Sequence, residues 1–303
     1  MNLTVQSVLR WLEDCQGITI CGQEIKWGRV KTIFKGTEGN RSVFVKIGIT
    51  EEAKKEVLMN KNGYDKMREI GAGNYTPNPR FVEFQGVPII IMDDCGENLF
   101  DMLKGAVNPR SIFDRICEEL WHLYRITKIK GGAEESLENS FRILEEQFSR
   151  YLSVYEPFSA NQRLLKEIRK KIFRVRSPFI CFAFWNFTPE DMCLSTSGLK
   201  IIDPPGCVVG LPMIDLACFA GSVRDASKLP GAEYGYDLLK KLASDAGEML
   251  GLKPKDTEFL FNFGRAVQCS LSARYRIGEE DGLSKKFFVE AKEFLAKCLS
   301  QRN

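Results

Sequence analysis

The sequence changes its periodicity once, near residue 95, and this change restricts the folds open to the chain more than any other feature. Before it, short apolar runs with strand character are separated by turn residues. After it, most apolar residues recur every three or four positions, as they do in helices. A run of strands followed by a run of helices predicts an α+β architecture, here with two domains, residues 1–94 and 95–303.

The first domain is predicted to contain two helices and five strands. The helices cover 3–15 and 51–69, and the strands cover 18–23, 30–35, 42–47, 80–84 and 87–92. Turn residues at 36–40 and at Gln85-Gly86 join two antiparallel hairpins. Residues 21–28 are then expected to form the loop between the first two strands.

The second domain is predicted to be mainly helical. Its helices are expected near 99–103, 112–123, 133–155, 161–174, 215–227, 232–250, 255–277 and 283–300. One strand-rich insertion, 179–203, interrupts them and contains a hairpin with strands 192–195 and 199–202.

Composition excludes several classes of protein. The 303 residues are 44% apolar, and 43 Lys and Arg balance 40 Asp and Glu, so the small net charge of +3 gives no support to nucleic-acid binding. The longest nearly uninterrupted apolar run, 179–185, is too short to span a membrane. No basic segment precedes an apolar core at the start, so we expect a cytoplasmic protein without membrane contact.

Cysteine and histidine usage narrows the chemistry further. Ten cysteines are scattered without a Cys-x-x-Cys pair, which indicates reduced thiols. The single histidine, His122, lies in a helical pattern and is expected to be structural. Most zinc sites and any nucleophile that needs a second histidine are therefore excluded.

The strand 42–47 places a lysine among apolar residues. Its alternation puts Phe44 and Lys46 on one face and the β-branched residues on the other. The arrangement is similar to that of the protein-kinase fold, in which such a lysine holds nucleotide phosphates and is held by a helix glutamate. Glu56 is the expected partner, with Glu52 one turn earlier as the alternative. An edge-strand lysine that extends into solvent would give the same pattern.

Two motifs in the second half carry a wider resemblance. Residues 184–193 read FWNFTPEDMC, 201–206 read IIDPPG, and 209–217 read VGLPMIDLA. They resemble the catalytic loop H-G-D-x-x-x-x-N and the metal motif I-D-x-x-G of the aminoglycoside phosphotransferase family, and are nearest in motif to its streptomycin kinase and hydroxyurea phosphotransferase branch. With the order of all elements, the resemblance covers nearly the whole chain and implies a protein-kinase-like fold of two lobes.

The resemblance implies roles for individual residues. Lys46 matches the phosphate-binding lysine, Asp203 the metal-binding aspartate, and Asp215 the aspartate that braces the catalytic loop. The catalytic loop departs from the family. Phe184 and Trp185 replace its His and Gly, Asn186 replaces its catalytic Asp, and Asp191 replaces its metal-binding Asn.

This exchange has chemical consequences. Asp191 and Asp203 offer the hard oxygen ligands that Mg²⁺ prefers. The Asn186 amide can orient a hydroxyl but cannot accept its proton. Glu190 could take over as the base, or it is a solvated loop carboxylate.

Nucleotide contacts are expected at two further places. The loop 21–28 would cover the phosphates, with Gly22 and Gly28 as its glycines, although it has no G-x-G-x-x-G pattern. Adenine would meet the backbone of Met92, Asp93, Asp94 and Cys95, where the two lobes join.

Three functions follow from these observations. The first is transfer of the γ-phosphate of ATP (or GTP), with Mg²⁺, to a hydroxyl of an unidentified small molecule. The second is a pseudokinase, a nucleotide-binding or scaffolding protein that has lost the base. The third is a kinase or effector that acts on a protein. Acidic residues near 134–138 and 279–281 and a basic patch over 166–176 are candidate surfaces for ligands or solvated helix faces.

Overall fold

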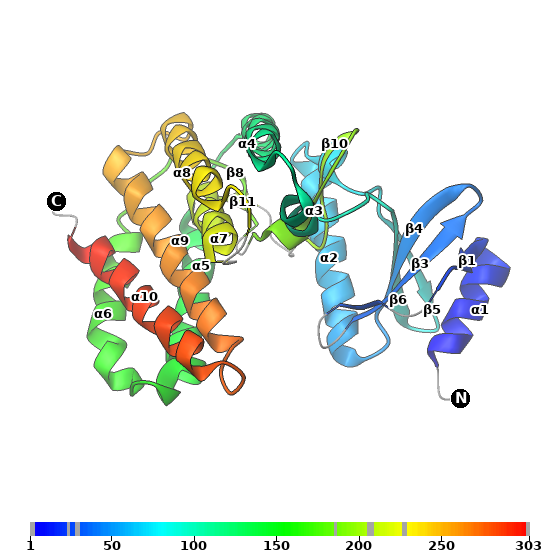
Figure 1. The fold of residues 1–303 in the computed structure, drawn as a ribbon, viewed down its shortest axis with the longest axis horizontal. Helices are drawn as coiled ribbons and strands as arrows, with labels where there is room; N and C mark the ends of the chain where they lie inside the picture. The colour runs from blue at the N-terminus through cyan, green and yellow to red at the C-terminus, as the bar shows by residue number, and fades with distance from the viewer. Residues whose placement is uncertain are drawn as a thin grey trace. The chain divides into compact units, whose positions relative to one another are not determined.

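The computed structural model describes residues 4–22, 25–27, 31–184, 187–204, 209–225 and 229–300. Contacts divide the chain into two compact units, one of Met1–Asn98 with Asp191–Val208 and one of Leu99–Glu190 with Val209–Asn303. The first unit holds an antiparallel sheet and the second is mainly helical, which confirms the predicted α+β class (Figure 1). The division at residue 94 stays a prediction, since the segment 191–208 groups with the first unit.

The sheet of the first unit has the strand order β1–β3–β4–β6–β5, and β2 also pairs with β3. Its strands are β1 Ile18–Ile20, β2 Ile25–Trp27, β3 Lys31–Glu38, β4 Arg41–Ile47, β5 Arg80–Phe84 and β6 Val87–Asp93. Every pair is antiparallel. The central strand β4 places Lys46 opposite Ile33 of β3 and Ile90 of β6.

Two helices pack against β4. α1, Val5–Gln16, buries Val8 and Leu12 in the cluster that contains Val45 of β4. α2, Glu51–Glu69, contacts β4 and β6 (Figure 1). It reaches the Lys46 side chain, which the alternation of β4 places on the face opposite that cluster. The Thr50 hydroxyl accepts the Ala53 N–H and caps α2 at the predicted residue.

One part of the predicted loop 21–28 is wrong. Residues 25–27 form β2, with Trp27 opposite Lys31, so β1 and β2 lie one after the other along β3. Gly22, with φ +117°, lies where this edge is interrupted. Gly22 and Gly28 favoured the prediction of a loop, although the Ile and Trp residues between them favour a strand. Gly28 lies outside the described residues.

A hairpin from the second half of the sequence groups with the first unit. Its strands are β9, Met192–Ser195, and β10, Gly198–Ile201, paired antiparallel with Met192 opposite Ile201. Asn98 forms a β-bridge to Cys193, and Lys200 Nζ donates to the Asn74 carbonyl oxygen at 2.5 Å. These contacts connect the hairpin to the sheet-bearing part of the chain.

The second unit contains eight described α-helices and a small sheet. The helices are α3 Leu99–Gly105, α4 Pro109–Ile126, α5 Glu134–Glu146, α6 Phe158–Ile172, α7 Pro212–Asp225, α8 Ala232–Met249, α9 Pro254–Arg274 and α10 Asp281–Ser300. The small sheet has the order β11–β8–β7, with β7 Ile129–Lys130, β8 Phe179–Phe182 and β11 Val209–Gly210. α7 is buried along most of its length because α8 and α9 flank it. No helix among the described residues is long and apolar enough to cross a membrane.

The cysteines of the described residues are all free thiols. Most of them are buried, as expected for reduced cysteines inside apolar helices. Burial raises the pKa of Cys117 to about 12, so this thiol stays protonated and unreactive.

Candidate functional site

The Lys46 ammonium is the centre of a polar cluster in the first unit. The side chain is 1% exposed, although it carries a charge. Its Nζ donates to Glu56 Oε1 at 3.3 Å, to Asn60 Oδ1 at 2.5 Å and to Asp203 Oδ1 at 2.9 Å. A buried ammonium is stable only when it is paired and hydrogen-bonded, and two of these acceptors are carboxylates. Of the two glutamates weighed from the sequence, Glu56 contacts Lys46, and Glu52 is exposed.

Helix α2 supplies three polar residues to this cluster. Glu56, Asn60 and Tyr64 are four residues apart and therefore share one face of the helix. Asn60 Nδ2 donates to the Pro204 carbonyl oxygen at 3.0 Å. The Tyr64 hydroxyl accepts the Asp203 N–H at 3.3 Å. Sequence reasoning missed Asn60 and Tyr64; their four-residue spacing from Glu56 was the available signal.

Asp203 has an unusual backbone conformation. Its φ of +55° lies in the left-handed region, where aspartate is tolerated better than most residues but at some cost. The Tyr64 bond to its N–H and the Asn60 bond to the next carbonyl fix the chain on both sides of it. Burial and the nearby Asp203 charge raise the pKa of Tyr64, so its hydroxyl remains neutral.

Asp191 lies at the open end of the β9–β10 hairpin. Its carbonyl oxygen accepts the Ile202 N–H at 2.9 Å, so its backbone is opposite the residue that precedes Asp203. The hairpin thus brings the backbone of both predicted metal-binding residues, Asp191 and Asp203, to the same end of the β9–β10 pair. Two carboxylates on such a scaffold suit a hard cation such as Mg²⁺.

Part of the predicted catalytic loop can be placed in the second unit. The Phe184 N–H donates to Asp215 Oδ2. Asp215 is 2% exposed at the start of α7, where a carboxylate also interacts favourably with the helix dipole. Trp185 and Asn186 lie outside the described residues. The carboxylate therefore holds the backbone two residues before Asn186.

Glu190 lies in the short helical turn Pro189–Asp191 and is exposed, although nearby protein atoms still remove part of the water around its carboxyl. Desolvation raises the pKa of its carboxyl, against the effect of the hydrogen bond that Thr188 donates at 3.4 Å. The Asp101 charge acts in the same direction as desolvation. A carboxylate with a raised pKa accepts a proton more readily, as a base must.

The segment predicted to meet adenine, Met92 to Cys95, covers the last two residues of β6 and the two residues after it. The Asp93 N–H donates to the Pro77 carbonyl at 2.8 Å and the Asp94 N–H to the Ser42 carbonyl at 3.0 Å. These two donors are thus used within the protein, so other groups of the segment would have to bind a base.

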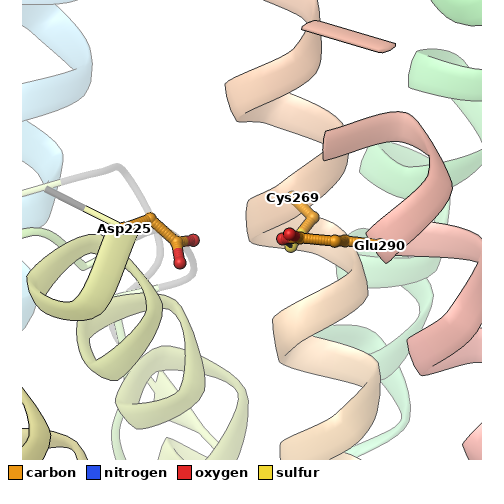
Figure 2. Close-up of side chains that lie close together, drawn as sticks. All are labelled: Asp225, Cys269 and Glu290. Atoms are coloured by element: carbon orange, nitrogen blue, oxygen red, sulfur yellow. Dashed lines mark hydrogen bonds between the residues drawn. The ribbon is translucent and has the colours of Figure 1, made fainter. Parts of the chain in front are cut away.

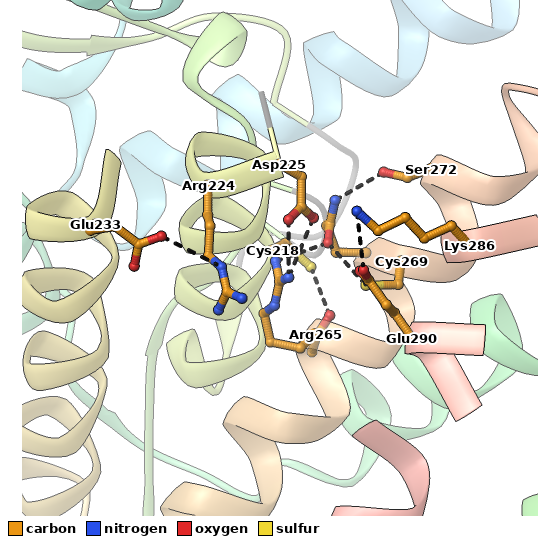
Figure 3. A network of polar contacts seen from close by, with 11 residues as sticks. Cys218, Arg224, Asp225, Glu233, Arg265, Cys269, Ser272, Lys286 and Glu290 are labelled. Atoms are coloured by element: carbon orange, nitrogen blue, oxygen red, sulfur yellow. Dashed lines mark hydrogen bonds and ion pairs between the residues drawn. The ribbon is translucent and has the colours of Figure 1, made fainter. Parts of the chain in front are cut away.

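A second polar network lies in the second unit. Asp225, Cys269 and Glu290 come from α7, α9 and α10, and their ligand atoms lie within 4.8 Å of one another (Figure 2). Arg265 Nη2 lies 3.3 Å from Asp225 Oδ2, and Lys286 Nζ lies 3.8 Å from Glu290 Oε1 (Figure 3). Each carboxylate thus has a cation beside it. The Arg265–Asp225 pair joins α9 to α7, whereas Lys286 and Glu290 both belong to α10, and the Cys269 thiol reaches Glu290 Oε2 at 3.9 Å.

Arg265 is the buried member of this network. It is 1% exposed, and its guanidinium lies 5.9 Å from the Tyr236 ring centre and 5.1 Å from that of Phe294. A pocket of about 440 Å³ adjoins it, with both cationic and anionic residues on its wall, among them Lys240 and Glu293. None of the site residues predicted from the sequence lines this pocket.

The charged surfaces noted in the sequence contact one another. Arg169 of the basic patch lies 3.1 Å from Glu138 of the acidic one, and Lys170 pairs with Glu167. His122 is exposed on α4, and its structural role stays a prediction. The residues around it in the helix are mostly apolar and buried, but His122 lies on the solvent-facing side of α4.

Comparison with known proteins identifies structural neighbours only. No protein-family model and no curated protein sequence matches the chain. A protein of Haemophilus somnus 129PT, provisionally described as a fructosamine-3-kinase, has a TM-score of 0.60 and 13% identity over 95% of this chain and 96% of its own. The choline kinase LicA of Streptococcus pneumoniae has a TM-score of 0.58 and 13% identity over 96% of this chain and 98% of its own.

A third neighbour was crystallised with ligands. A thermostable mutant of the aminoglycoside phosphotransferase APH(4)-Ia, in a ternary complex with AMP-PNP and hygromycin B, has a TM-score of 0.61 and 10% identity over 98% of this chain and 100% of its own. At this identity, the likeness establishes the fold alone. The chain has the kinase-like fold of small-molecule phosphotransferases.

Proposed function

Starting from that fold, we propose that the protein is an ATP- and Mg²⁺-dependent phosphotransferase that transfers the γ-phosphate to a hydroxyl of a small molecule. The observation that carries the proposal is the buried Lys46 ammonium, held between Glu56 of α2 and Asp203 after β10. Burial of a charge costs free energy, and a functional role would account for that cost. Phosphate binding gives Lys46 such a role, as in the kinase-like enzymes.

Mg²⁺ would be held by Asp203 and Asp191. Both are carboxylates at one end of the β9–β10 hairpin, and carboxylate, phosphate and water oxygens are the ligands that Mg²⁺ prefers. The ion would neutralise charge on the nucleotide phosphates. The AMP-PNP complex of APH(4)-Ia supports ATP as the nucleotide, with GTP as the alternative.

The residues of the chain would mainly position the reactants. Lys46 binds phosphate oxygens, and the Asn186 amide orients the acceptor hydroxyl. Glu190, with its raised pKa, is the candidate to accept the hydroxyl proton. Phosphoryl transfer depends mostly on alignment and charge neutralisation, so a weak base lowers the rate without abolishing the reaction.

The acceptor is proposed from the neighbours. They are described as kinases of fructosamine, choline and aminoglycosides, all small hydroxyl-bearing molecules. The motif around Asp203 and Asp215 favours the streptomycin kinase and hydroxyurea phosphotransferase branch within that group.

A binding measurement tests the proposal. Isothermal titration calorimetry should detect ATP with Mg²⁺, and Lys46→Met should weaken this binding by roughly 10- to 150-fold, as expected for a lost hydrogen bond to a charged group. Lys55→Met, an exposed lysine of α2, is the matched control. Absence of Mg·ATP binding by the unaltered protein would exclude the proposed function.

A turnover assay completes the test. ADP release is measured with hygromycin B, choline and a fructosamine, each compared with a reaction without acceptor. Acceptor-dependent release supports transfer to a small molecule.

The pseudokinase function is the second candidate, and the amide at position 186 favours it. Mg·ATP binding without turnover, even in Asn186→Asp across a broad acceptor panel, would identify the protein as a pseudokinase.

A further inference from the structure

The polar face of α2 reaches two segments that are far apart in the sequence. Glu56 and Asn60 contact Lys46 of β4, and Asn60 and Tyr64 contact the chain at Asp203 and Pro204. Asn60 is the residue common to both sets. Position 60 and position 204 are separated by 144 residues of sequence.

The orientation of the Asn60 amide follows from the chemistry of its partners. The ammonium of Lys46 can only donate, so the amide oxygen must face it, and this oxygen is Oδ1. The Pro204 carbonyl can only accept, so the NH₂ group must face that side. A flipped amide would place donor against donor and acceptor against acceptor. One side chain therefore serves both partners in one orientation only.

An asparagine is a costly choice at this position. Asn60 is 1% exposed, its amide must be desolvated, and asparagine is a poor residue for the interior of a helix. Buried neighbours on the same helix, such as Val57, are apolar. A leucine would fill the position at lower cost if only packing were needed. The two hydrogen bonds are what asparagine supplies and leucine cannot.

The Asn60 bridge differs from the Lys46–Asp203 ion pair in one respect. The proposed function assigns phosphate to Lys46 and Mg²⁺ to Asp203, so these ligands would compete with the ion pair between the two side chains. The bond from Asn60 goes to the backbone carbonyl of Pro204, the residue after Asp203, and does not use the Asp203 carboxylate. The bridge can therefore persist when the ion pair opens.

We propose that Asn60 is a positioning residue that holds the Lys46 ammonium and the Asp203 segment at a fixed separation for the binding of Mg·ATP. The role rests on the proposed function. It also accounts for the left-handed φ of Asp203, because Asn60 and Tyr64 restrain the backbone on each side of that residue.

Two substitutions and a matched control test this role. Asn60→Leu removes both hydrogen bonds at similar volume. Asn60→Asp keeps an acceptor for Lys46 but places an oxygen against the Pro204 carbonyl. Asn62→Leu makes the first change two residues away, at an exposed position of the same helix.

The first measurement needs no nucleotide. Hydrogen–deuterium exchange should be faster for the amides of 201–203 in Asn60→Leu and in Asn60→Asp, because both lose the bond to Pro204. Asn62→Leu should exchange like the unaltered protein. Unchanged exchange at 201–203 in Asn60→Leu would overturn the bridge as a restraint on Asp203.

The second measurement separates positioning from stability. Asn60→Leu should weaken Mg·ATP binding by about tenfold, the effect of leaving buried polar groups unpaired, and should weaken metal-free ATP binding less. A fall in unfolding free energy with unchanged Mg·ATP affinity would overturn the positioning role. If the unaltered protein fails to bind Mg·ATP, the proposed function falls and the role falls with it. If the unaltered protein binds Mg·ATP and Asn60→Leu binds it equally well, the positioning role is overturned and the proposed function is not.

Discussion

The Lys46 ammonium lies 2.9 Å from Asp203 Oδ1, and 157 residues of sequence separate the two. The contact connects the central strand of the sheet to the end of the β9–β10 hairpin. The sequence predicts different ligands for the two residues, phosphate for Lys46 and metal for Asp203. In the structure, the two side chains form an ion pair, and Glu56 and Asn60 also accept from Lys46.

Asp203→Asn should remove the dependence of ATP binding on Mg²⁺. The new amide oxygen can still accept a hydrogen bond from Lys46, but it lacks the charge that a hard cation requires. ATP affinity measured by calorimetry with and without Mg²⁺ should then become the same. The control is Asp237→Asn, an exposed aspartate of α8. Continued enhancement by Mg²⁺ would show that Asp203 does not hold the metal.

Asn186→Asp should accelerate phosphoryl transfer. A carboxylate can accept the proton of the acceptor hydroxyl, and general base catalysis contributes about 10²–10⁴ in rate. Mg·ATP affinity should stay unchanged, because the substitution acts on the acceptor. Initial rates of ADP release, measured with an acceptor that the unaltered enzyme uses, provide the test. Equal rates would mean that another group, such as Glu190, already acts as the base.

Asp94 should make the stability of the protein depend on pH. Burial alone would raise the pKa of its carboxyl, but hydrogen bonds from Lys35, the Gly96 N–H and Ser42 outweigh burial and lower the pKa below the ordinary 3.8. Between the folded-state and unfolded-state pKa values of Asp94, the unfolded state binds more protons than the folded state. The stabilisation is therefore complete above the unfolded-state pKa and is lost as the pH falls through the folded-state pKa.

Asp94→Asn tests this dependence. Unfolding by urea should show a loss of about 1.5–3 kcal/mol at pH 7, typical for hydrogen bonds to a charged group, and the difference from the unaltered protein should narrow below pH 3.8. Glu83→Gln, an exposed carboxylate of β5, should show no such gap. A gap of constant size from pH 7 to pH 3 would contradict the lowered pKa.

Gly221→Ala should destabilise the second unit. A Cβ on Gly221 would lie 1.4 Å from Arg265 Nη1 and 2.6 Å from Gln268 Oε1. Arg265 would have to leave its ion pair with Asp225, which should cost about 2–4 kcal/mol. Thermal unfolding of the variant measures this loss.

The control substitution, Gly282→Ala, is expected to raise the free energy of unfolding rather than lower it. A Cβ on Gly282, in the first turn of α10, would meet no heavy atom within 4 Å. Gly282→Ala should stabilise the protein by about 0.5 kcal/mol through helix propensity. A comparable loss of stability in both variants would show that the steric conflict at Gly221 is not the cause.

Local sequence signals predicted a substantial part of the fold. Thr50 and the acidic residues that follow it gave the start of α2, and the structure has the helix at Glu51–Glu69 as predicted. The alternation of β4 correctly separated Lys46 from the face that packs on α1. Both signals depend on residues close together in the chain.

The features that the sequence did not reveal depend on distant residues. The four-residue spacing places Asn60 on the helix face of Glu56, but its burial depends on Pro204, 144 residues away in the sequence. The sequence did not predict β2, because Gly22 and Gly28 flank it and are typical of a loop. Only the pairing of β1 and β2 with the same strand, β3, shows that the edge continues after Gly22. The position of Glu56 relative to Lys46 could be anticipated, since ten residues separate them.

The contribution of the β9–β10 hairpin to the first unit has a consequence for synthesis. Met1–Asn98 leaves the ribosome well before Asp191–Val208, although both belong to one compact unit. At roughly 5–20 residues per second, about a hundred residues of delay amount to about 5–20 s. During that interval the nascent chain carries Lys46 without Asp203 as its acceptor. The first segment of this unit is therefore translated in full before the hairpin that supplies Asp203.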